Sequence, residues 1–356
     1  MKITFLSPVP NMSGGERVVA TYADKLVERG HDVTIVACNP FAKRFVLNPR
    51  EALRRRARRR ALKNAPYHRM KAELKVIGRK GRILEEDAPQ ADVLIATWWE
   101  TAVWGAEMAP DKGAKVYFMQ DYGASGQEFE RIRPTWRLPY RFVTLTGLLK
   151  DMILEEAPDA KVDVVLNAVE ERFRGAPVRE KAARPTVGFV FRPEPSKGID
   201  VAVDALARVR AATPDLRVVA FGKPQTSLPD FVEYRENASD DDIVALYRSA
   251  DLWLFPSRME GFGLPILEAM ASRTPVVGAR CGAAPDLIED GRNGYVVEVG
   301  DAEAMADRIR RVLSARPEDW ALMSDAAAAT IEDYDWDDAA DRFEAALKAA
   351  AEARGA

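Results

Sequence analysis

Short apolar runs alternate with longer amphipathic stretches along most of the chain. In its first part, the runs that predict β-strands are residues 2–7, 32–37, 92–96, 115–119, 142–146 and 162–166. These runs are apolar without clean alternation, which is typical of parallel strands that are covered on both faces. Residues 15–29 are predicted to form a helix, because one side of it carries Val18, Val19, Tyr22 and Leu26.

A second series of the same kind begins near Thr186. Its predicted strands are residues 186–191, 217–221, 251–255, 275–278 and 295–297, and its predicted helices are residues 197–212, 240–248, 264–271 and 302–313. Alternating strands and helices predict right-handed βαβ units and doubly wound parallel sheets. Two such series in 356 residues predict two domains, joined by a linker at residues 173–185. Ligands of open α/β sheets bind outside the carboxyl ends of the strands, so two facing domains would form a cleft there.

The composition excludes several classes of protein. Hydrophobic residues make up 47% of the chain, charged residues make up 30%, and the net charge is −3. The chain is therefore neither disordered nor uniformly polybasic. Two cysteines and two histidines argue against a disulfide framework, a cysteine-rich metal site and a Ser-His-Asp triad. No apolar run approaches the roughly 20 residues that span a bilayer, and the first residues do not match a signal peptide, so we expect a cytoplasmic protein.

Positive charge is concentrated in one segment. Between Arg50 and Arg82 there are 14 basic and two acidic residues, a net charge of +12, whereas the rest of the chain carries −15. A helix is predicted at residues 51–63, and its thin apolar side means that charge would dominate any membrane binding. It contains Arg54, Arg55, Arg56, Arg58, Arg59 and Arg60. We expect an anionic membrane surface or an anionic acceptor as the partner. A solvated face is the alternative, and nucleic acid is disfavoured because Tyr67 alone could stack on bases.

The segment at residues 260–268 carries the clearest chemical motif. It reads Glu-Gly-Phe-Gly-Leu-Pro-Ile-Leu-Glu, follows a predicted strand and opens a predicted helix. Gly261 and Gly263 allow backbone amides to approach a ligand closely, and a helix N-terminus favours an anion such as a diphosphate. Glu260 and Glu268 could both accept hydrogen bonds from sugar hydroxyl groups. A turn before an ordinary helix is the alternative for a lone Gly-x-Gly, but the two spaced glutamates favour a ligand site.

This motif, continued by Ala-Met-Ala, resembles the signature of the retaining family 4 glycosyltransferases, which have the GT-B fold. Residues 11–17 resemble the family's N-terminal glycine loop, and Arg192…Lys197-Gly198 resembles its Arg-x4-Lys-Gly element. The resemblance implies an α/β architecture with two doubly wound, Rossmann-like parallel-sheet domains that face each other across a cleft. Residues 1–172 would form the acceptor-side domain and residues 173–335 the nucleotide-sugar-binding domain. The final helix, residues 336–356, would cross back to the first domain.

The resemblance also implies a role for each matched residue. Arg192 and Lys197 would bind the donor diphosphate and offset the charge that develops on the leaving group. Glu268 would hold the ribose, and Glu260 would contact the transferred sugar. Further donor contacts are implied for Gly14, Gly15, Gly261, Phe262, Gly263, Leu264 and, at the nucleobase, Arg235.

The chain departs from the family pattern after the predicted strand at residues 115–119. Many family members have a histidine there, whereas this chain has Gln120-Asp121, so Gln120 or Asp121 would serve near the sugar. This variant, together with Trp98-Trp99, is similar to a branch that includes bacterial rhamnosyltransferases of surface polysaccharides. Trp98 and Trp99 are candidates for stacking on an acceptor sugar, and packing in the core is the alternative.

The sequence therefore predicts a retaining hexosyl- or deoxyhexosyltransferase that uses a nucleotide-diphosphate-sugar. Its acceptor would be a glycan, a lipid-linked molecule or another anion in cell-envelope polysaccharide or glycolipid synthesis, at the inner face of the membrane. We expect no cofactor and no metal. One alternative is a sugar-nucleotide epimerase on the same fold, which the scarcity of histidine disfavours. Another is a non-enzymatic membrane or nucleic-acid adaptor, in which Arg192, Lys197, Glu260 and Glu268 would be expendable.

Overall fold

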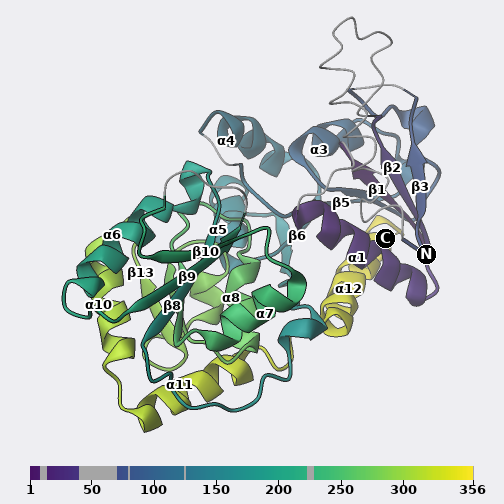
Figure 1. Cartoon of the computed structure of the whole chain (residues 1–356). Helices are drawn as coiled ribbons and strands as arrows, with labels where there is room; N and C mark the ends of the chain where they lie inside the picture. The colour runs from purple at the N-terminus through teal and green to yellow at the C-terminus, as the bar shows by residue number, and fades with distance from the viewer. Residues whose placement is uncertain (9–13, 40–69, 79–80, 124–125, 223–227, 356) are drawn as a thin grey trace, which may run out of the picture. The chain divides into compact units, whose positions relative to one another are not determined.

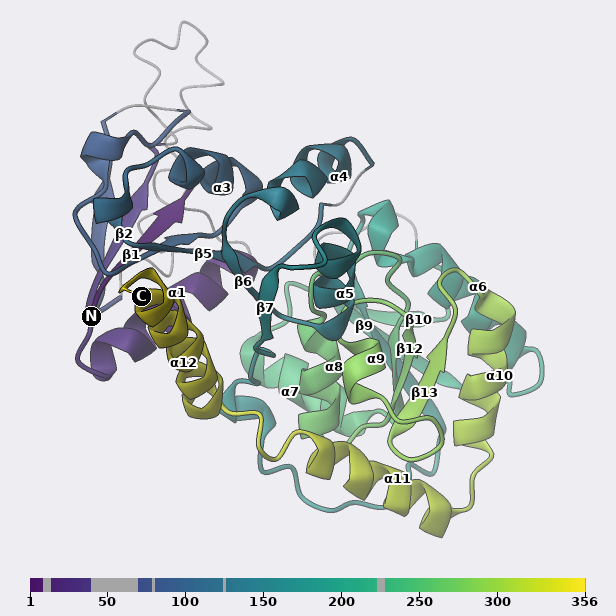
Figure 2. The same cartoon turned by 180° about the vertical axis from the view of Figure 1, so that it is seen from behind.

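The computed structural model describes residues 1–8, 14–39, 70–78, 81–123, 126–222 and 228–355. The contacts divide the chain into two compact units, which Figures 1 and 2 show from opposite sides. Unit 1 comprises Met1–Leu145, Leu149–Val165 and Asp337–Ala356, and unit 2 comprises Thr146–Leu148 and Leu166–Trp336. The Arg-rich stretch from Arg54 to Arg60, with its predicted helix, lies outside the described residues.

Unit 1 is built on a seven-stranded parallel sheet in the order β3-β2-β1-β4-β5-β6-β7. The strands are β1 (Lys2–Ser7), β2 (Asp32–Ala37), β3 (Glu73–Val76), β4 (Val93–Ala96), β5 (Ala114–Met119), β6 (Arg141–Thr144) and β7 (Lys161–Val164). The hydrophobic pattern predicts all of these except β3. Glu73 and Lys75 interrupt the apolar run of β3, which lies at the sheet edge and has mostly exposed side chains.

Helices cover both faces of this sheet. They are α1 (Gly14–Glu28), α3 (Trp99–Ala106), α4 (Gly126–Ile132), α5 (Gly147–Glu156) and α12 (Trp336–Gly355). The last helix, α12, packs on α1 and the sheet through a buried aromatic cluster in which the ring centroids of Tyr22 and Phe343 are 4.4 Å apart. Ion pairs reinforce this contact, with Lys25 Nζ 2.9 Å from Asp337 and Arg29 2.8 Å from Asp341. The end of the chain is therefore part of the core of unit 1.

Unit 2 is built on a six-stranded parallel sheet in the order β10-β9-β8-β11-β12-β13. The strands are β8 (Thr186–Phe191), β9 (Arg217–Gly222), β10 (Val232–Glu236), β11 (Leu252–Phe255), β12 (Val276–Ala279) and β13 (Gly294–Val297). The pattern misses β10, a charged edge strand. The helices are α6 (Ile199–Arg210), α7 (Asp240–Ser249), α8 (Leu264–Ala271), α9 (Ala284–Leu287), α10 (Ala302–Leu313) and α11 (Pro317–Thr330).

The two faces of the central strand β8 pack differently. Val187, Phe189 and Phe191 belong to one buried cluster with apolar residues of α6 and α10. On the other face, Trp253 lies directly over Gly188, where an added Cβ would be 2.1 Å from the indole ring. Only glycine leaves room for this ring, which explains why the predicted strand at 186–191 contains a residue that otherwise weakens strands.

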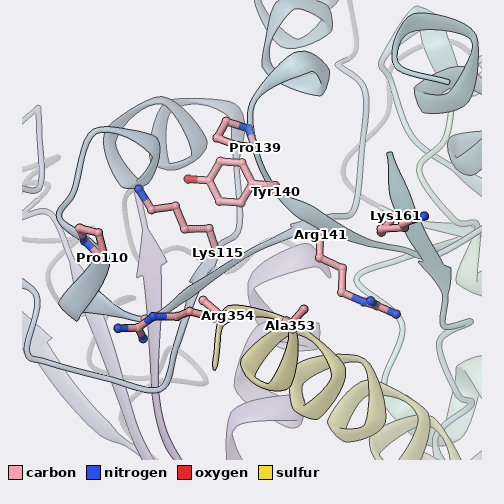
Figure 3. A pocket seen from close by; sticks show the side chains of 11 residues that line it. Pro110, Lys115, Pro139, Tyr140, Arg141, Lys161, Ala353 and Arg354 are labelled. Carbon is pink, nitrogen blue, oxygen red and sulfur yellow. The ribbon is translucent and has the colours of Figure 1, made fainter. Parts of the chain in front are cut away.

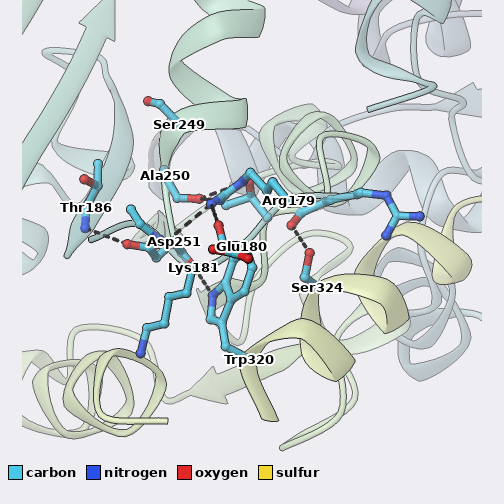
Figure 4. A network of polar contacts seen from close by, with 12 residues as sticks. Arg179, Glu180, Lys181, Thr186, Ser249, Ala250, Asp251, Trp320 and Ser324 are labelled. Atoms are coloured by element: carbon cyan, nitrogen blue, oxygen red, sulfur yellow. Dashed lines mark hydrogen bonds and ion pairs between the residues drawn. The ribbon is translucent and has the colours of Figure 1, made fainter. Parts of the chain in front are cut away.

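A polar network at the amino ends of β8 and β11 fixes the segment that precedes β8 (Figure 4). The buried Asp251 carboxylate accepts hydrogen bonds from the backbone N–H groups of Ala182 (2.8 Å) and Thr186 (2.9 Å). The guanidinium of Arg179 pairs with Asp251 and stacks over the Trp320 ring, 4.6 Å from its centroid. Part of the predicted linker is thus held against unit 2 by specific side chains.

Candidate active site

The candidate site of unit 2 lies where its strand order reverses, between β8 and β11. These strands are neighbours in the sheet although they are far apart in sequence, so the loops that follow them lie side by side. The backbone N–H of Arg258, in the second loop, donates to the carbonyl of Ser196 in the first at 2.7 Å. The Arg258 guanidinium also makes two hydrogen bonds of 2.7 Å to Asp200. The two loops therefore form one connected structure.

Two predicted site residues meet across these loops. The Lys197 ammonium lies 2.9 Å from Glu260 Oε1, and the Ser257 hydroxyl donates to the same oxygen at 3.1 Å. Both side chains are partly exposed, 28% for Lys197 and 20% for Glu260, so a ligand can reach them. This pairing holds a cation and a hydrogen-bond acceptor next to each other, an arrangement that suits a ligand with both phosphate and hydroxyl groups.

Glycines with left-handed backbone conformations allow the loops to come this close. Gly198 has φ of +63°, and an added Cβ would be 2.0 Å from the carbonyl oxygen of Pro256. Gly263, immediately before α8, has φ of +99°, and its Cβ would be 2.5 Å from the ring of Phe255. Phe262 is buried and its carbonyl accepts the Ala283 N–H at 2.7 Å, which leaves Leu264 as the partly exposed start of α8.

Glu268 lies on α8, behind this loop. The Tyr247 hydroxyl donates to Glu268 Oε2 at 2.6 Å, and Oε1 accepts no hydrogen bond from the described residues. Burial raises the pKa of Glu268, while the Tyr247 hydrogen bond and the positive charges of Arg172 and Arg192 lower it. One oxygen of a positioned carboxyl group is thus left for a ligand. Tyr247 was not predicted as a site residue from the sequence, and only the fold shows that its hydroxyl positions Glu268.

Arg192 and Arg235 are both exposed. Burial raises the pKa values of Tyr247 and Tyr234, and the nearby charge of Arg192, directly after β8, partly offsets this rise. Arg235 lies on β10, where its charge acts on Glu233 and Asp242. No ion pair joins Arg192 or Arg235 to Glu260 in the described parts of the chain.

Unit 1 has a corresponding switch point between β1 and β4. Ser7 ends β1, and its hydroxyl lies 3.3 Å from both carboxyl oxygens of Glu16, in the first turn of α1. Glu16 is 8% exposed, and burial raises its pKa to about 8. Glu16 was not predicted as a site residue from the sequence, although its position directly after Gly14-Gly15, in the first turn of a helix, was a usable signal.

Gln120 and Gly15 come together at this end of the sheet. The Gln120 Oε1 atom is buried without a hydrogen-bond partner in the described residues, 3.4 Å from where a Cβ would lie on Gly15. Asp121 instead uses Oδ1 to accept the backbone N–H groups of Tyr122 at 2.7 Å and Gly123 at 3.2 Å. The two residues therefore differ: the Asp121 carboxylate supports a local turn, and the Gln120 amide has unused hydrogen-bonding capacity.

Trp98 and Trp99 are half-buried at the start of α3. The Thr101 hydroxyl accepts the Trp98 N–H at 3.0 Å and donates to the Trp98 carbonyl at 2.7 Å, which fixes the backbone of this turn. Each ring thus keeps some surface that an acceptor could contact. No group of three or more His, Cys, Asp or Glu side chains that could hold a metal ion occurs among the described residues. No helix in these parts of the chain is long and apolar enough to cross a membrane.

Comparisons with known proteins agree with this architecture. Residues 13–144 match the family described as "Glycosyl transferase 4-like domain", and residues 184–315 match "Glycosyl transferases group 1". D-inositol 3-phosphate glycosyltransferase from Saccharomonospora viridis is 32% identical over 228 residues, 55% of this chain and 52% of that protein. The protein of the same name from Corynebacterium glutamicum is 34% identical over 188 residues, which are 46% of this chain and 44% of that protein. The chain thus spans about half the length of these curated relatives.

Solved structures resemble the whole chain. Anabaena HepE in complex with UDP and glucose has a TM-score of 0.72 and 20% identity, covering 98% of this chain and 100% of that one. Sucrose-phosphate synthase from Thermosynechococcus elongatus has a TM-score of 0.70 and 18% identity, covering 99% of both chains. The fold is the α/β GT-B fold, with two Rossmann-like parallel-sheet domains. One of the two family matches lies in each unit of the chain.

The two glutamates are expected to respond differently to loss of charge. Glu268→Gln should weaken binding of the free nucleotide, because one of its oxygens remains for a ribose hydroxyl. Glu260→Gln should leave nucleotide binding nearly unchanged and slow sugar transfer, because Glu260 lies beside Lys197 at the loop surface. Calorimetric titration with the nucleotide diphosphate and an assay of transfer would separate the two effects. The opposite pattern would exchange these assignments.

Proposed function

We propose that this protein is a retaining glycosyltransferase that transfers a sugar from a nucleotide-diphosphate-sugar. The observation that carries this proposal is the Lys197–Glu260 pair, held on two neighbouring loops at the switch point of unit 2 with Glu268 behind it. The cation and the amides at the start of α8 suit the diphosphate of such a donor. The two carboxyl groups suit the hydroxyl groups of the ribose and the sugar that the diphosphate joins.

Each residue has a distinct part in the proposed reaction. Lys197 and Arg192 bind the diphosphate and stabilise the negative charge that develops as the sugar–phosphate bond breaks. Glu260 accepts hydrogen bonds from the transferred sugar, and Glu268 from the ribose. The acceptor hydroxyl attacks on the face from which the diphosphate departs, and a phosphate oxygen takes the hydroxyl proton. Gln120, next to Gly15, is the proposed contact of unit 1 with the sugar or acceptor.

The similar proteins guide the choice of substrates. HepE binds UDP and UDP-glucose in its solved structures, which makes UDP-sugars the first donors to test. The relatives named D-inositol 3-phosphate glycosyltransferase suggest a phosphorylated polyol as acceptor, beside the glycan or lipid-linked acceptor that the sequence predicts. A phosphorylated polyol is anionic, which fits the basic segment at residues 50–82. We also propose that the protein acts in cell-envelope synthesis and belongs to the rhamnosyltransferase-like branch.

A ligand screen followed by an assay of transfer tests the function. The true donor should raise the melting temperature, since a ligand that binds only the folded state stabilises it. UDP-, GDP-, ADP- and dTDP-sugars would be compared, and the stabilising donor then incubated with inositol phosphate or with lipid-linked acceptors. Formation of a glycosylated product with release of the nucleoside diphosphate supports the proposal. Interconversion of the donor without an acceptor indicates an epimerase, and no response to any donor indicates an adaptor.

Transfer activity is expected to survive metal removal. The positive charge at the proposed diphosphate site comes from Lys197, Arg192 and the amides of α8, so no divalent cation is needed there. The measurement is the transfer rate after dialysis against EDTA, with and without added Mg²⁺ or Mn²⁺. Complete loss of activity that either ion restores would contradict this expectation.

The Arg-rich segment is expected to attach the protein to anionic membranes. Replacement of Arg54, Arg55, Arg56, Arg58, Arg59 and Arg60 by Gln should remove most binding to vesicles that contain phosphatidylglycerol. Wild-type binding should weaken as salt rises, because the Debye length is about 10 Å at 0.1 M salt. Turnover of a soluble acceptor should stay nearly unchanged. Equal binding of the wild type to neutral and anionic vesicles would contradict an electrostatic attachment.

A further inference from the structure

The described part of unit 1 contains a cavity of about 360 Å³ at the amino ends of β5, β6 and β7 (Figure 3). The charged groups in its wall do not face a common point. The Lys115 ammonium is bound by two backbone carbonyls, and the Arg141 guanidinium is paired with Asp163. Lys161 and Arg354 point away from each other. A more specific arrangement lies in unit 2, where a buried tyrosine holds a carboxyl group of the candidate active site.

The side chain of Tyr247, on α7, is completely buried and fixed by its surroundings. The centroid of its ring lies 4.0 Å from that of Trp253, and the ring makes edge-on contacts with Phe173 and Phe221, both at 5.7 Å. The Tyr247 carbonyl accepts a hydrogen bond from the Thr274 hydroxyl at 2.7 Å, which fixes the backbone as well. The Tyr247 hydroxyl therefore has little freedom to move.

Among the described residues, this hydroxyl is the one hydrogen-bond donor to the Glu268 carboxyl group. The distance of 2.6 Å is typical of an O–H group that donates to a carboxylate. Arg172 and Arg192 are near enough to lower the pKa of Glu268, but neither forms an ion pair with it in this part of the chain. Arg172 is instead paired with Glu170 at 3.0 Å. The orientation of the Glu268 carboxyl group thus depends on Tyr247.

The second oxygen of Glu268 is left accessible. Oε1 accepts no hydrogen bond from the described residues, and it is not among their buried unpartnered polar atoms, so solvent reaches it. A glutamate without a fixed partner would lose side-chain freedom when it binds a ligand. Because Tyr247 already holds Oε2, most of that freedom is lost before a ligand arrives, which favours binding.

We propose that Tyr247 determines the selectivity of the donor site for ribonucleotides, because its hydroxyl holds Glu268 where Oε1 accepts a hydrogen bond from the ribose. The inference rests on the proposed function and deepens it by naming the class of nucleotide. A carboxylate that is held in place cannot turn away when the ribose hydroxyls are missing, so a deoxy analogue leaves it unpaired in a partly buried position. Without Tyr247, Glu268 could turn towards water and would distinguish the two nucleotides less.

Calorimetric titration with a matched pair of nucleotides tests this role. The pair is UDP and 2′,3′-dideoxyuridine diphosphate, and the corresponding ADP and GDP pairs replace it if UDP does not bind. The wild type should bind the ribonucleotide about tenfold or more tightly than the dideoxy analogue, and Tyr247→Phe should weaken binding of the ribonucleotide about tenfold. The same variant should change the dissociation constant of the analogue less than about twofold, whereas a general effect on the fold would weaken both nucleotides alike.

The matched control is Tyr295→Phe, on β13 of the same unit. The Tyr295 ring is also buried, but its hydroxyl makes no hydrogen bond to the described residues. This variant should leave both dissociation constants within about twofold of the wild type. In a Glu268→Ala protein, adding Tyr247→Phe should have a similarly small effect, because there is no carboxyl group left to hold.

Glu268→Asp tests the same role without changing Tyr247. Its shorter side chain cannot reach both the tyrosine and the ribose, so it should lose the preference for the ribonucleotide as Tyr247→Phe does. The proposed role of Tyr247 is overturned if Tyr247→Phe weakens both nucleotides equally, or if either variant keeps the full preference of the wild type. A wild type that binds both nucleotides equally, or dTDP alone, also overturns it. A wild type that binds no nucleoside diphosphate contradicts instead the proposed function.

Discussion

Lys197→Ala is expected to lower kcat about 100- to 1,000-fold, the usual cost of removing one group that stabilises charge in a transition state. The Lys197 ammonium is partly exposed, lies 2.9 Å from Glu260 and sits at the switch point where the diphosphate is proposed to bind. Arg192→Ala should act in the same direction with a smaller effect, because Arg192 is exposed and no ion pair fixes it in the described residues. Steady-state kinetics with the donor identified by the screen would measure both.

The control must show that the fold is unchanged. Arg208→Ala, on α6 in the same unit, removes an exposed cation that pairs with Asp204 one turn away, and it should leave kcat within about twofold of the wild type. Lys197→Ala should have a melting temperature close to that of this control, since partly exposed ion pairs contribute about 1 kcal/mol or less. A folded Lys197→Ala protein with the wild-type rate would refute the role of Lys197.

The local motifs of the candidate site could be predicted from sequence because they join residues that are close along the chain. Glu260, the two glycines and Glu268 lie within one loop and helix, so their spacing alone indicates a ligand site. The ion pair between Glu260 and Lys197 requires two loops that are far apart in sequence, and it follows from the order of β8 and β11 in the sheet. The support of Glu268 by Tyr247 likewise depends on packing between α7 and α8.

The fold itself was predictable where strands are buried on both faces. Strands such as β4 and β11 are apolar throughout, and the hydrophobic pattern predicts their bounds to within one residue. Edge strands escape this pattern, because exposed positions in β3 and β10 accept charged residues. The weakly amphipathic α11 was also missed: it packs on α8, and its fully buried Trp320 belongs to the apolar cluster that contains residues of α6 and α10.

Trp320 also belongs to the network from which the largest effect on stability is expected. Asp251 is completely buried at the start of β11, and the indole N–H of Trp320 donates to its backbone carbonyl at 2.9 Å. The Asp251 carboxylate in turn accepts two backbone N–H groups of the segment that leads into β8 and pairs with Arg179. Asp251 therefore connects this segment and the starts of two central strands through its carboxylate, and α11 through its backbone carbonyl (Figure 4).

Asp251→Ala is expected to lower the free energy of unfolding by about 3 kcal/mol. Breaking a buried ion pair costs about 3–5 kcal/mol, and the lower end applies because Arg179 can turn towards water. The two backbone N–H groups of Ala182 and Thr186 would also lose their acceptor. In a unit of this size, such a loss lowers the melting temperature by about 6–12 °C, which calorimetry would measure.

The matched control is Asp319→Ala, which removes an exposed carboxylate from a pair with Arg316 on the surface of α11. It should lower the free energy of unfolding by less than about 0.5 kcal/mol, as surface substitutions usually do. Lys181→Met gives an intermediate case, because the Lys181 ammonium donates to carbonyls at the end of α10 without a carboxylate partner at contact distance. If Asp251→Ala and Asp319→Ala had the same melting temperature, the segment before β8 would not depend on Asp251. The network would then be a consequence of the fold and not one of its supports.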